Sequence, residues 1–430
     1  MAKSQPIVGI DVGTSKIATI VAVPAEDGEN LNVVGASIVD SQGIKKSQIV
    51  DIEEAIKAIT LSVEAAERMA GFSITHAFVS VGGVHITSKN STGVVAVSQP
   101  QGEITSEDVR RVIEAARAVS LPSTQEIIHV LPREYTVDSQ EGIKDPVGMS
   151  GIRLEAEAHL VTGSSTAMRN LIKCITELGI HLDGLIFSGF AASDAVLTET
   201  EKELGVVLVD IGGGTTSIAI WVDGSLAHSA VLPVGARNIT NDLAIGMRLS
   251  LDAAEKVKRH LSSKAKKPSV PKGEKETEES DDIDLAAIGV SEEHSKTSRK
   301  TLVDGIIRPR LQEIFTMVGI ELRDSQFGGR TPAGVVLTGG GAKTVDITSM
   351  CKRVLSLPTR IGYPKHLAGL IDDIQDPASA VGEGLILYGA QNRALISESG
   401  SRTSFANFTK HLPVKGAVGK AVEFFKQFLP

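Results

Sequence analysis

Two short glycine-rich segments in opposite halves of the chain have the residue types of a phosphate-binding site. The first is DVGTSK (Asp11–Lys16) and the second is DIGGGTT (Asp210–Thr216). Glycine admits positive φ angles and has no Cβ, so successive backbone N–H groups can point at one anion. An aspartate before such a turn could hold a magnesium ion, largely through water molecules, beside the phosphates. Together the two segments would hold a phosphate chain from both sides.

Each segment alone has an ordinary explanation. Asp and Gly turn easily, so a tight surface turn would account for either one. Two matching copies weaken that explanation, because each turn lies between an apolar strand and a second, alternating strand. The apolar runs predict β-hairpins over Ile7–Val23 and Gly205–Val222.

Two further segments would complete a nucleotide site. GVVLTGGGAKTVDI (Gly334–Ile347) predicts a buried strand, three glycines and a helix, whose N–H groups and dipole favour an anion. AAEKVKRH (Ala253–His260) predicts a helix with Glu255 and Lys258 on one face. Without the other segments, these two side chains would be read as an exposed ion pair.

The composition narrows the class of protein. A chain of 430 residues exceeds one core of usual size, so about two to four domains are expected. The net charge of −8 and the aromatic content of 3 % argue against a nucleic-acid partner. Cys174 and Cys351 lie far apart, which predicts neither a disulfide framework nor a zinc site. No apolar leader and no membrane-spanning run is evident, so a soluble cytoplasmic chain is expected.

The order of these segments resembles the superfamily of actin, Hsp70 and the sugar kinases, in which two similar domains close on ATP. Over residues 5–392, and again at the C-terminus, the chain also resembles the FtsA family of bacterial cell-division proteins. The segments that carry this resemblance are SVEAAERMAG (Ser62–Gly71), VGGVHITSKNSTGVV (Val81–Val95), HVLPREYTVD (His129–Asp138), DPVGMSGIRLEAEAHLVTG (Asp145–Gly163), LPVGARNITNDLAIGM (Leu232–Met247) and RPRLQEIF (Arg308–Phe315). Those between 129 and 163 have no counterpart in Hsp70 or the sugar kinases.

The resemblance implies an α/β, actin-like two-domain fold with a small subdomain inserted in the first half. The expected units are subdomain 1A at 1–82 and 164–202, the inserted subdomain 1C at 83–163, subdomain 2A at 203–240 and 334–392, subdomain 2B at 241–333 with a charged loop at 262–282, a flexible linker at 393–413 and an amphipathic helix at 414–430.

The resemblance also implies which residues bind Mg-ATP. The phosphate contacts fall on Gly13, Thr14, Ser15 and Lys16 of the first hairpin and on Gly212, Gly213, Gly214, Thr215 and Thr216 of the second. The adenosine contacts fall on Glu255, Lys258, Gly339, Gly340 and Gly341. Asp11 and Asp210 would be the carboxylates on the magnesium side.

Rapid ATP hydrolysis is not expected. Superfamily members that hydrolyse ATP readily place a Glu or Gln to orient the attacking water. In the Hsp70-like and MreB-like relatives, that Glu starts an E-P-x-A-A-A segment, but here Ser188 and Gly189 stand where Glu-Pro would fall. Asp194 is the remaining candidate, although it lies about one helical turn too far along the chain. ATP would therefore lock a conformation rather than drive chemical work.

Subdomain 2B contains a charged segment and a possible docking site. KAKKPSVPKGEKETEESDD (Lys264–Asp282) is almost free of large apolar residues, which predicts a mobile loop. DIDLAAIGV (Asp282–Val290) then predicts a buried strand. In the FtsA family this lobe docks the C-terminal peptide of the tubulin-like protein FtsZ, so Arg299, Lys300 and Arg308 are candidate contacts.

The C-terminal segment VKGAVGKAVEFFKQFL (Val414–Leu429) has the pattern of a helix lying in a membrane interface. At about 100° per residue its apolar side chains share an arc of roughly 160°. The apolar candidates are Val414, Val418, Val422, Phe424, Phe425, Phe428 and Leu429, with Lys415, Lys420 and Lys426 on the opposite side. A basic, strongly amphipathic helix after a polar linker favours an anionic lipid surface over the protein's own core. The FtsA family uses such a helix to reach the inner membrane.

The resemblance implies an ATP-binding protein that polymerises head-to-tail on the cytoplasmic face of the bacterial inner membrane at the division site. It would be peripheral, would tether FtsZ, and would recruit other division proteins through 83–163. The alternatives are a small-molecule kinase of the same fold, a chaperone-like ATPase and a pilus-assembly relative. No motif supplies a kinase's catalytic base or substrate pocket, and a kinase leaves the tail unexplained. Ser188 and the lack of a substrate-binding domain after Asn392 disfavour the chaperone. The segments within 129–163 and the tail argue against the pilus relative.

Overall fold

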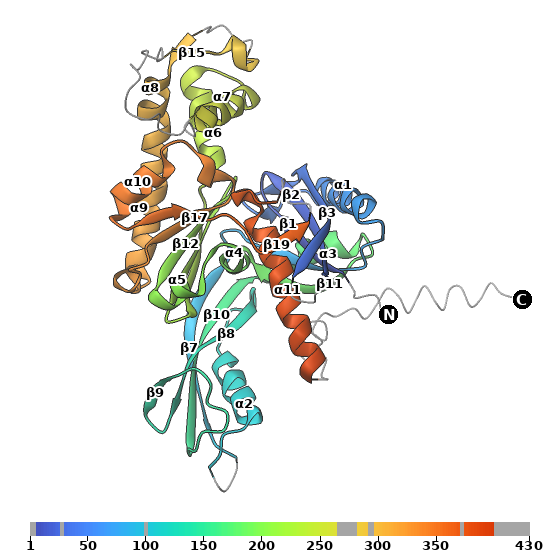
Figure 1. Ribbon diagram of the computed structural model, residues 1–430, viewed down its shortest axis with the longest axis vertical. Helices are drawn as coiled ribbons and strands as arrows, with labels where there is room; N and C mark the ends of the chain where they lie inside the picture. The colour runs from blue at the N-terminus through green and yellow to red at the C-terminus, as the bar shows by residue number, and fades with distance from the viewer. Residues whose placement is uncertain are drawn as a thin grey trace, which may run out of the picture.

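The computed structural model describes residues 6–25, 30–98, 102–264, 282–290, 296–369 and 374–399. Two β-sheets lie side by side in the middle of the molecule, with a helical lobe at one end and a third sheet at the other (Figure 1). The two central sheets supply the two glycine-rich turns.

The first central sheet has the strand order β11-β6-β1-β2-β3-β19. Its strands are β1 (Ile7–Val12), β2 (Lys16–Pro24), β3 (Leu31–Asp40), β6 (His76–Val81), β11 (His181–Phe187) and β19 (Leu367–Gly369). β1 pairs antiparallel with β2 and parallel with β6. Because side chains alternate along a strand, Val8 and Ile10 pack with α1 (Ile52–Ala70) and α3 (Ser165–Thr176) on one face. Ile7 packs on the opposite face.

The second central sheet has the order β14-β13-β12-β17-β18. Its strands are β12 (Val206–Ile211), β13 (Thr216–Val222), β14 (Ser225–Leu232), β17 (Val335–Thr338) and β18 (Thr359–Ile361). β12 pairs antiparallel with β13 and parallel with β17, so the second sheet repeats the pairing of β1 with β2 and β6. The sequence prediction of two equivalent hairpins is therefore confirmed.

Helices α4 (Ser188–Val196) and α11 (Ala380–Ser399) join the two sheets through one shared core. Ala191 of α4 and Leu385 of α11 are fully buried there beside Ile7 of the first sheet and Leu208 of the second. The two helices touch closely, because a Cβ on Gly384 would lie 1.8 Å from the Ala191 carbonyl oxygen. Helices α9 (Arg308–Asp324) and α10 (Ile347–Leu355) cover the outer face of the second sheet, with Leu311 and Met350 in its core.

The third sheet, at the lower end of Figure 1, has the order β7-β10-β8-β9 and carries helix α2 (Ser106–Arg117). Its strands are β7 (Thr87–Ala96), β8 (Gln125–Val137), β9 (Gln140–Ile143) and β10 (Arg153–Ser164). A capping box starts α2, in which the Thr105 and Asp108 side chains bond to each other's backbone N–H groups. Val112 of α2 packs with Leu154 and Ala156 in a small core of its own.

The lobe at the upper end contains α6 (Ala236–Met247), α7 (Leu251–Lys264), α8 (Arg299–Leu302) and the strands β15 (Asp282–Asp284) and β16 (Lys296–Ser298). The strand predicted over 282–290 is wrong beyond Asp284. Leu285 is buried at a turn, Ala286–Ile288 form a 3₁₀ turn, and Gly289 ends it at φ 72°. Of the charged loop predicted at 262–282, residues 265–281 lie outside the described residues.

The predicted linker and tail are mostly beyond the described chain. The backbone from 393 to 399 belongs to α11, so the predicted linker does not begin at 393. The amphipathic segment 414–430 lies outside the described residues. None of the described helices is long and apolar enough to span a membrane.

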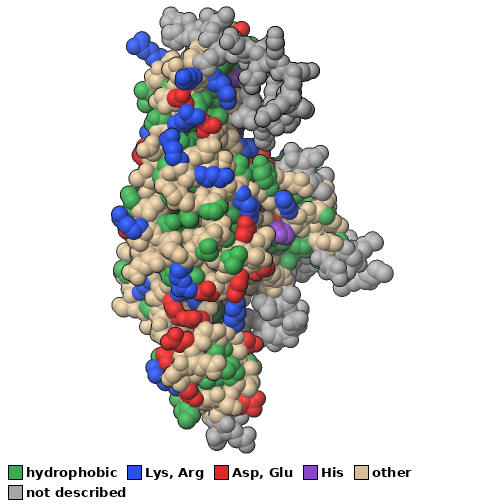
Figure 2. All heavy atoms as spheres, turned by 60° about the vertical axis from the view of Figure 1, so that its left-hand side comes forward, with side chains coloured by type: hydrophobic (Ala, Val, Ile, Leu, Met, Phe, Trp, Pro, Cys, Tyr) green, Lys and Arg blue, Asp and Glu red, His purple; other side chains and the backbone are tan. Residues whose placement is uncertain are grey.

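Figure 2 shows one face of the molecule with Lys and Arg side chains spread along its length and Asp and Glu side chains among them. Charges of both signs thus share this face, rather than forming a broad field of one sign.

Candidate functional site

A cavity of about 920 Å³ lies between the two central sheets. Such a volume is within the usual range for small-molecule sites, about 300–1,000 Å³. Fourteen of the sixteen residues predicted from sequence to contact Mg-ATP line this cavity: Asp11, Gly13, Thr14, Ser15, Lys16, Asp210, Gly212, Gly213, Thr215, Glu255, Lys258, Gly339, Gly340 and Gly341. Segments from four separate parts of the chain therefore meet at one place.

The other two predicted residues, Gly214 and Thr216, do not line the cavity. Thr216 is fully buried, and its hydroxyl donates a hydrogen bond to the Val234 carbonyl at 2.8 Å. A Cβ on Gly214 would lie 2.8 Å from Thr14 Cγ2. Thr216 therefore secures the second hairpin, and Gly214 lets the two hairpins approach each other.

The turns of both hairpins are closed in the same way. Gly13 N–H donates to the Lys16 carbonyl at 3.0 Å, and Gly212 N–H donates to the Thr215 carbonyl at 2.9 Å. The two turns are also in contact, since a Cβ on Gly213 would lie 2.8 Å from Ser15 Oγ.

Ser47, which sequence reasoning missed, bridges the two hairpins. It lies in the turn between β4 (Ile44–Lys45) and β5 (Gln48–Ile49) and has a positive φ of 56°. Its backbone N–H donates to Thr14 Oγ1 at 2.8 Å, and its Oγ lies 3.1 Å from Thr215 Oγ1. No sequence signal marks this residue, because Lys46 and Ser47 are unusual residues for positive φ angles.

Asp11 and Asp210 are buried at the ends of β1 and β12, each about 8 % exposed. Burial raises the pKa of Asp210 to about 7, and the charge of Asp11 adds to the rise. Burial also raises the pKa of Asp11, against the opposing effects of Lys16 and of a hydrogen bond from Ser80 Oγ at 2.8 Å. Two carboxylates that repel each other in a buried site suit a divalent cation, which favours their ionised forms.

Lys16 and Ser80 hold this part of the cavity in place. Lys16 Nζ donates to the Ala378 carbonyl at 2.5 Å, and burial lowers the pKa of its ammonium group. Ser80 Oγ also accepts from Val12 N–H at 3.0 Å. The sequence does contain a signal for Ser80. This residue is polar and lies near the end of an apolar strand, just before Gly82.

Glu255 and Lys258 lie on α7 and share a partly buried network with Thr240 of α6. Lys258 Nζ lies 2.6 Å from Glu255 Oε2 and 2.8 Å from Thr240 Oγ1, which in turn donates to Glu255 at 2.6 Å. Lys258 is only 9 % exposed. Glu255 and Lys258 are therefore not the exposed ion pair that these two residues alone would suggest, because both also contact Thr240.

The glycine triplet 339–341 follows β17 and passes beside the second hairpin. Gly339 has a φ of 80°, and a Cβ on it would lie 2.2 Å from Asp210 Oδ1. The glycines lead into a 3₁₀ turn, Gly340–Lys343, and α10 begins only at Ile347. The predicted order of strand, glycines and helix is confirmed, with this turn between the last two. The helix N-terminus predicted to meet an anion is not part of the cavity lining, because α10 begins six residues after Gly341.

Ser188, at the start of α4, lines the cavity, and its Oγ lies 3.1 Å from Ser217 Oγ. Asp194, the weak catalytic candidate from sequence, is not part of the lining. Its carboxylate is buried in an ion pair with Lys202 Nζ at 3.0 Å. The structure thus gives Asp194 a partner within the fold rather than a position beside the cavity.

The residues proposed for peptide docking lie on α8 and at the first residue of α9. Arg299 is half-buried on α8, and its Nη2 lies 3.5 Å from the Leu261 carbonyl oxygen. Lys300 is exposed next to it. Arg308 begins α9 and pairs with Asp304 and with Asp346, the latter at 2.6 Å. Arg308 therefore already forms two ion pairs within the fold.

Comparison with known proteins gives the family. A family model described as "Cell division protein FtsA" matches residues 207–384, and one described as "SHS2 domain inserted in FTSA" matches 83–162. The chain is 40 % identical over 410 residues to the "Cell division protein FtsA" of Pseudomonas aeruginosa, covering 95 % of each chain.

Solved structures give the fold. A chain of the "PilM-PilN type IV pilus biogenesis complex" is similar with a TM-score of 0.63 and 16 % identity, covering 89 % of this chain and 98 % of that one. "MreB 5 of Spiroplasma citri bound to AMPPNP" is similar with a TM-score of 0.54 and 15 % identity, covering 92 % and 99 %. These similarities confirm the predicted actin-like α/β fold, and the identity to the Pseudomonas protein extends over nearly the whole chain. The protein belongs to the FtsA family of cell division proteins.

Proposed function

We propose that the cavity binds ATP with Mg²⁺ and that the bound nucleotide holds the two halves of the molecule in one arrangement. The observation that carries this proposal is the convergence of both glycine-rich hairpins, α7 and the 339–341 triplet on a single cavity of about 920 Å³. The similar MreB structure, bound to AMPPNP, supports the choice of nucleotide.

In this proposal each group has a defined task. Backbone N–H groups of the two turns hold the phosphates, and Lys16 adds a positive charge beside them. Asp11 and Asp210 hold the magnesium ion, largely through its water molecules, and the ion neutralises phosphate charge. Glu255 and Lys258 lie on the adenosine side, where Gly339 to Gly341 leave room for the base and sugar.

Hydrolysis would be slow. The carboxylates that line the cavity are Asp11, Asp40, Asp210, Asp252 and Glu255, and none of them lies on α4. The start of α4, where a water-orienting carboxylate would be expected in this fold, has Ser188 instead. ATP would therefore act by stabilising the closed arrangement, and turnover would follow only slowly.

We also propose that the protein polymerises on the cytoplasmic face of the inner membrane at the division site and tethers FtsZ there. The support is its family, together with the basic amphipathic sequence at 414–430. One short helix would bind lipid only modestly, whereas many copies on one filament would bind far more tightly. Other division proteins would bind through 83–163, and the FtsZ C-terminal peptide would bind the 2B lobe near Arg299, Lys300 and Arg308.

The test is electron microscopy of the full-length protein on an anionic lipid monolayer with Mg-ATP, beside a variant that ends at Pro413. Filaments are expected for the full chain only. If the truncated chain forms the same lipid-bound filaments, the tail is not the membrane anchor. If the full chain forms neither filaments nor a lipid-bound layer, the proposal of a membrane-bound polymer fails.

A further inference from the structure

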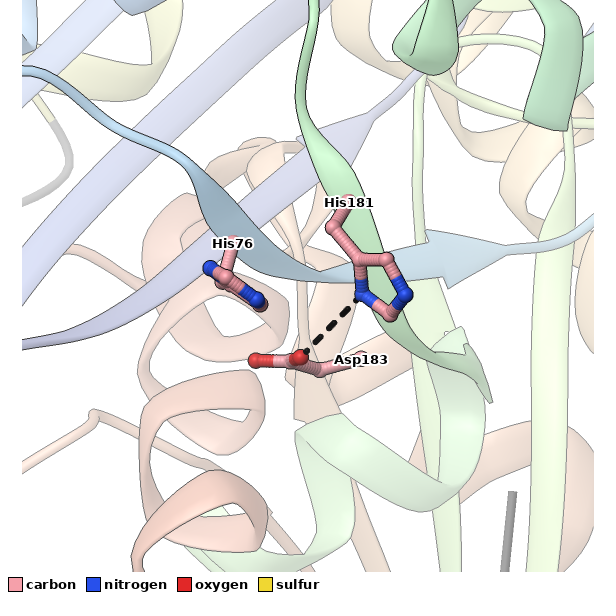
Figure 3. A group of neighbouring side chains, drawn as sticks. All are labelled: His76, His181 and Asp183. Carbon is pink, nitrogen blue, oxygen red and sulfur yellow. Dashed lines mark ion pairs between the residues drawn. The ribbon is translucent and has the colours of Figure 1, made fainter. Parts of the chain in front are cut away.

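Two histidines and an aspartate lie together at the edge of the first central sheet, away from the cavity. They are His76 at the start of β6 and His181 and Asp183 on β11 (Figure 3). The two imidazole ring centres are 5.0 Å apart, and His181 Nδ1 lies 3.7 Å from Asp183 Oδ1. One ligand atom from each residue falls within 4.8 Å of the other two.

The backbone brings these side chains together. His76 and His181 are direct partners in the parallel pairing of β6 with β11, and His181 N–H donates to the Thr75 carbonyl at 2.8 Å. The pairing register shifts between Leu182 and Gly184, so Asp183 is an extra residue with no partner on β6. Such a bulge re-aims a side chain, and in Figure 3 the Asp183 carboxylate lies beside both rings.

The donor set matches a transition metal rather than magnesium or calcium. Imidazole nitrogens suit Zn²⁺, Cu²⁺ and Ni²⁺, and zinc sites with three protein ligands leave a position for water. His76 and His181 are both exposed, so water can reach the site. Thr75 Oγ1 lies 3.1 Å from His76 Nδ1, and a hydrogen bond there would help to hold the imidazole in one orientation.

To bind one metal ion, the three ligand atoms would have to move only a little closer together. Tetrahedral zinc with ligands at about 2.0–2.1 Å would place the ligand atoms about 3.4 Å from one another. The present separations of up to 4.8 Å can close by rotation of the two exposed histidine side chains. Within the described part of the chain, no other three His, Cys, Asp or Glu residues meet this spacing.

We propose that His76, His181 and Asp183 bind one divalent transition-metal ion, with Zn²⁺ as the probe. The ion would join the edge strand β11 to β6. The site is at the opposite end of β6 from Ser80 and Gly82, which line the cavity. Metal binding here therefore does not depend on the proposed nucleotide site, and either proposal can fail without the other.

The test is isothermal titration of the full-length protein with ZnCl₂, with His76→Ala and His181→Ala as variants. The matched control is His366→Ala, since His366 is also exposed and lies 3.3 Å from a single carboxylate, Glu383. One zinc per chain is expected to bind the wild type and the control alike. Each histidine variant should weaken that binding at least tenfold, and Asp183→Asn should weaken it several-fold.

A second readout separates a metal site from a change in folding. Co²⁺ bound by the wild type should give the visible absorption of a four- or five-coordinate nitrogen–oxygen site, and His181→Ala should lose it. The metal-free variants should unfold at the same temperature as the wild type, because both rings are exposed. Equal zinc affinity in the wild type and both histidine variants would overturn the proposal, as would an equal loss in His366→Ala.

Discussion

Ser47 Oγ lies 3.1 Å from Thr215 Oγ1, so a two-residue turn of the first half reaches the glycine-rich hairpin of the second. The same residue donates its N–H to Thr14 in the first hairpin. Ser47 therefore links the two hairpins that line the cavity. A ligand held by both turns would also strengthen this bridge between the halves.

Ser47→Ala is expected to weaken ATP binding about five- to tenfold, because losing one such hydrogen bond costs about 1 kcal/mol. Isothermal titration with Mg-ATP would measure the change. Ser41→Ala is the matched control, since Ser41 also lines the cavity but its buried hydroxyl has no hydrogen-bond partner among the described residues. Equal affinities in wild type and Ser47→Ala would show that the bridge contributes nothing to binding.

Asp210→Asn is expected to stabilise the nucleotide-free protein, and more so at pH 8 than at pH 5. The pKa of Asp210 is raised from 3.8 to about 7, so folding favours its protonated form. Between pH 3.8 and about 7 the native state retains a proton that the unfolded chain has released. The free energy of unfolding of the wild type therefore falls as the pH rises across this interval, and the loss is complete once the pH has risen through 7. Asn cannot ionise, so above pH 7 the free energy of unfolding of the variant should exceed that of the wild type by at most about 4 kcal/mol.

Urea unfolding at the two pH values would measure that gain. With Mg-ATP present the order should reverse, because only the wild type keeps both carboxylates for the magnesium ion. A difference between variant and wild type that is the same at pH 5 and pH 8 would contradict the assignment of a raised pKa to Asp210.

Asp194→Asn is expected to lower stability without changing ATP turnover. The variant would leave the buried Lys202 ammonium with only Glu199 as an ionic partner, at 3.1 Å. Removing one partner of a largely buried ion pair costs about 3 kcal/mol or more, although Glu199 would offset part of that loss. Chemical unfolding and steady-state phosphate release would report the two quantities. Loss of turnover in a variant that remains folded would instead make Asp194 catalytic.

The sequence was sufficient for the parts of the cavity that depend on local patterns. Each hairpin has an apolar strand, an Asp and a glycine-rich turn, and this order alone predicts strand, turn and strand. The glycines of 339–341 were found for the same reason. Their role beside Asp210 became visible only in the structure, where a Cβ on Gly339 would overlap that carboxylate.

The parts that depend on contacts between distant segments could not be predicted. Ser47 carries no motif, and it reaches Thr215 only because the two halves fold against each other. Thr216 continues the motif in sequence, but strand alternation turns its hydroxyl toward Val234 instead of the cavity. The 282–290 segment has the composition of a buried strand, yet its partner β16 pairs with only Asp282–Asp284.

ATP binding in the cavity can be tested by a single titration with a variant that fills the cavity. Gly340 lines the cavity, is exposed, and has only Ala378 Cβ, at 3.8 Å, within 4 Å of an added Cβ. Gly340→Leu should therefore fold normally while filling space that the nucleotide needs. Gly329→Leu is the matched control, because Gly329 lies in a similar 3₁₀ turn outside the cavity lining and has no atom within 4 Å of an added Cβ.

Isothermal titration with Mg-ATP should show one site per chain in the wild type and in Gly329→Leu, and an affinity at least tenfold weaker in Gly340→Leu. Unchanged binding in Gly340→Leu, or no binding by the wild type, would show that ATP does not bind in this cavity.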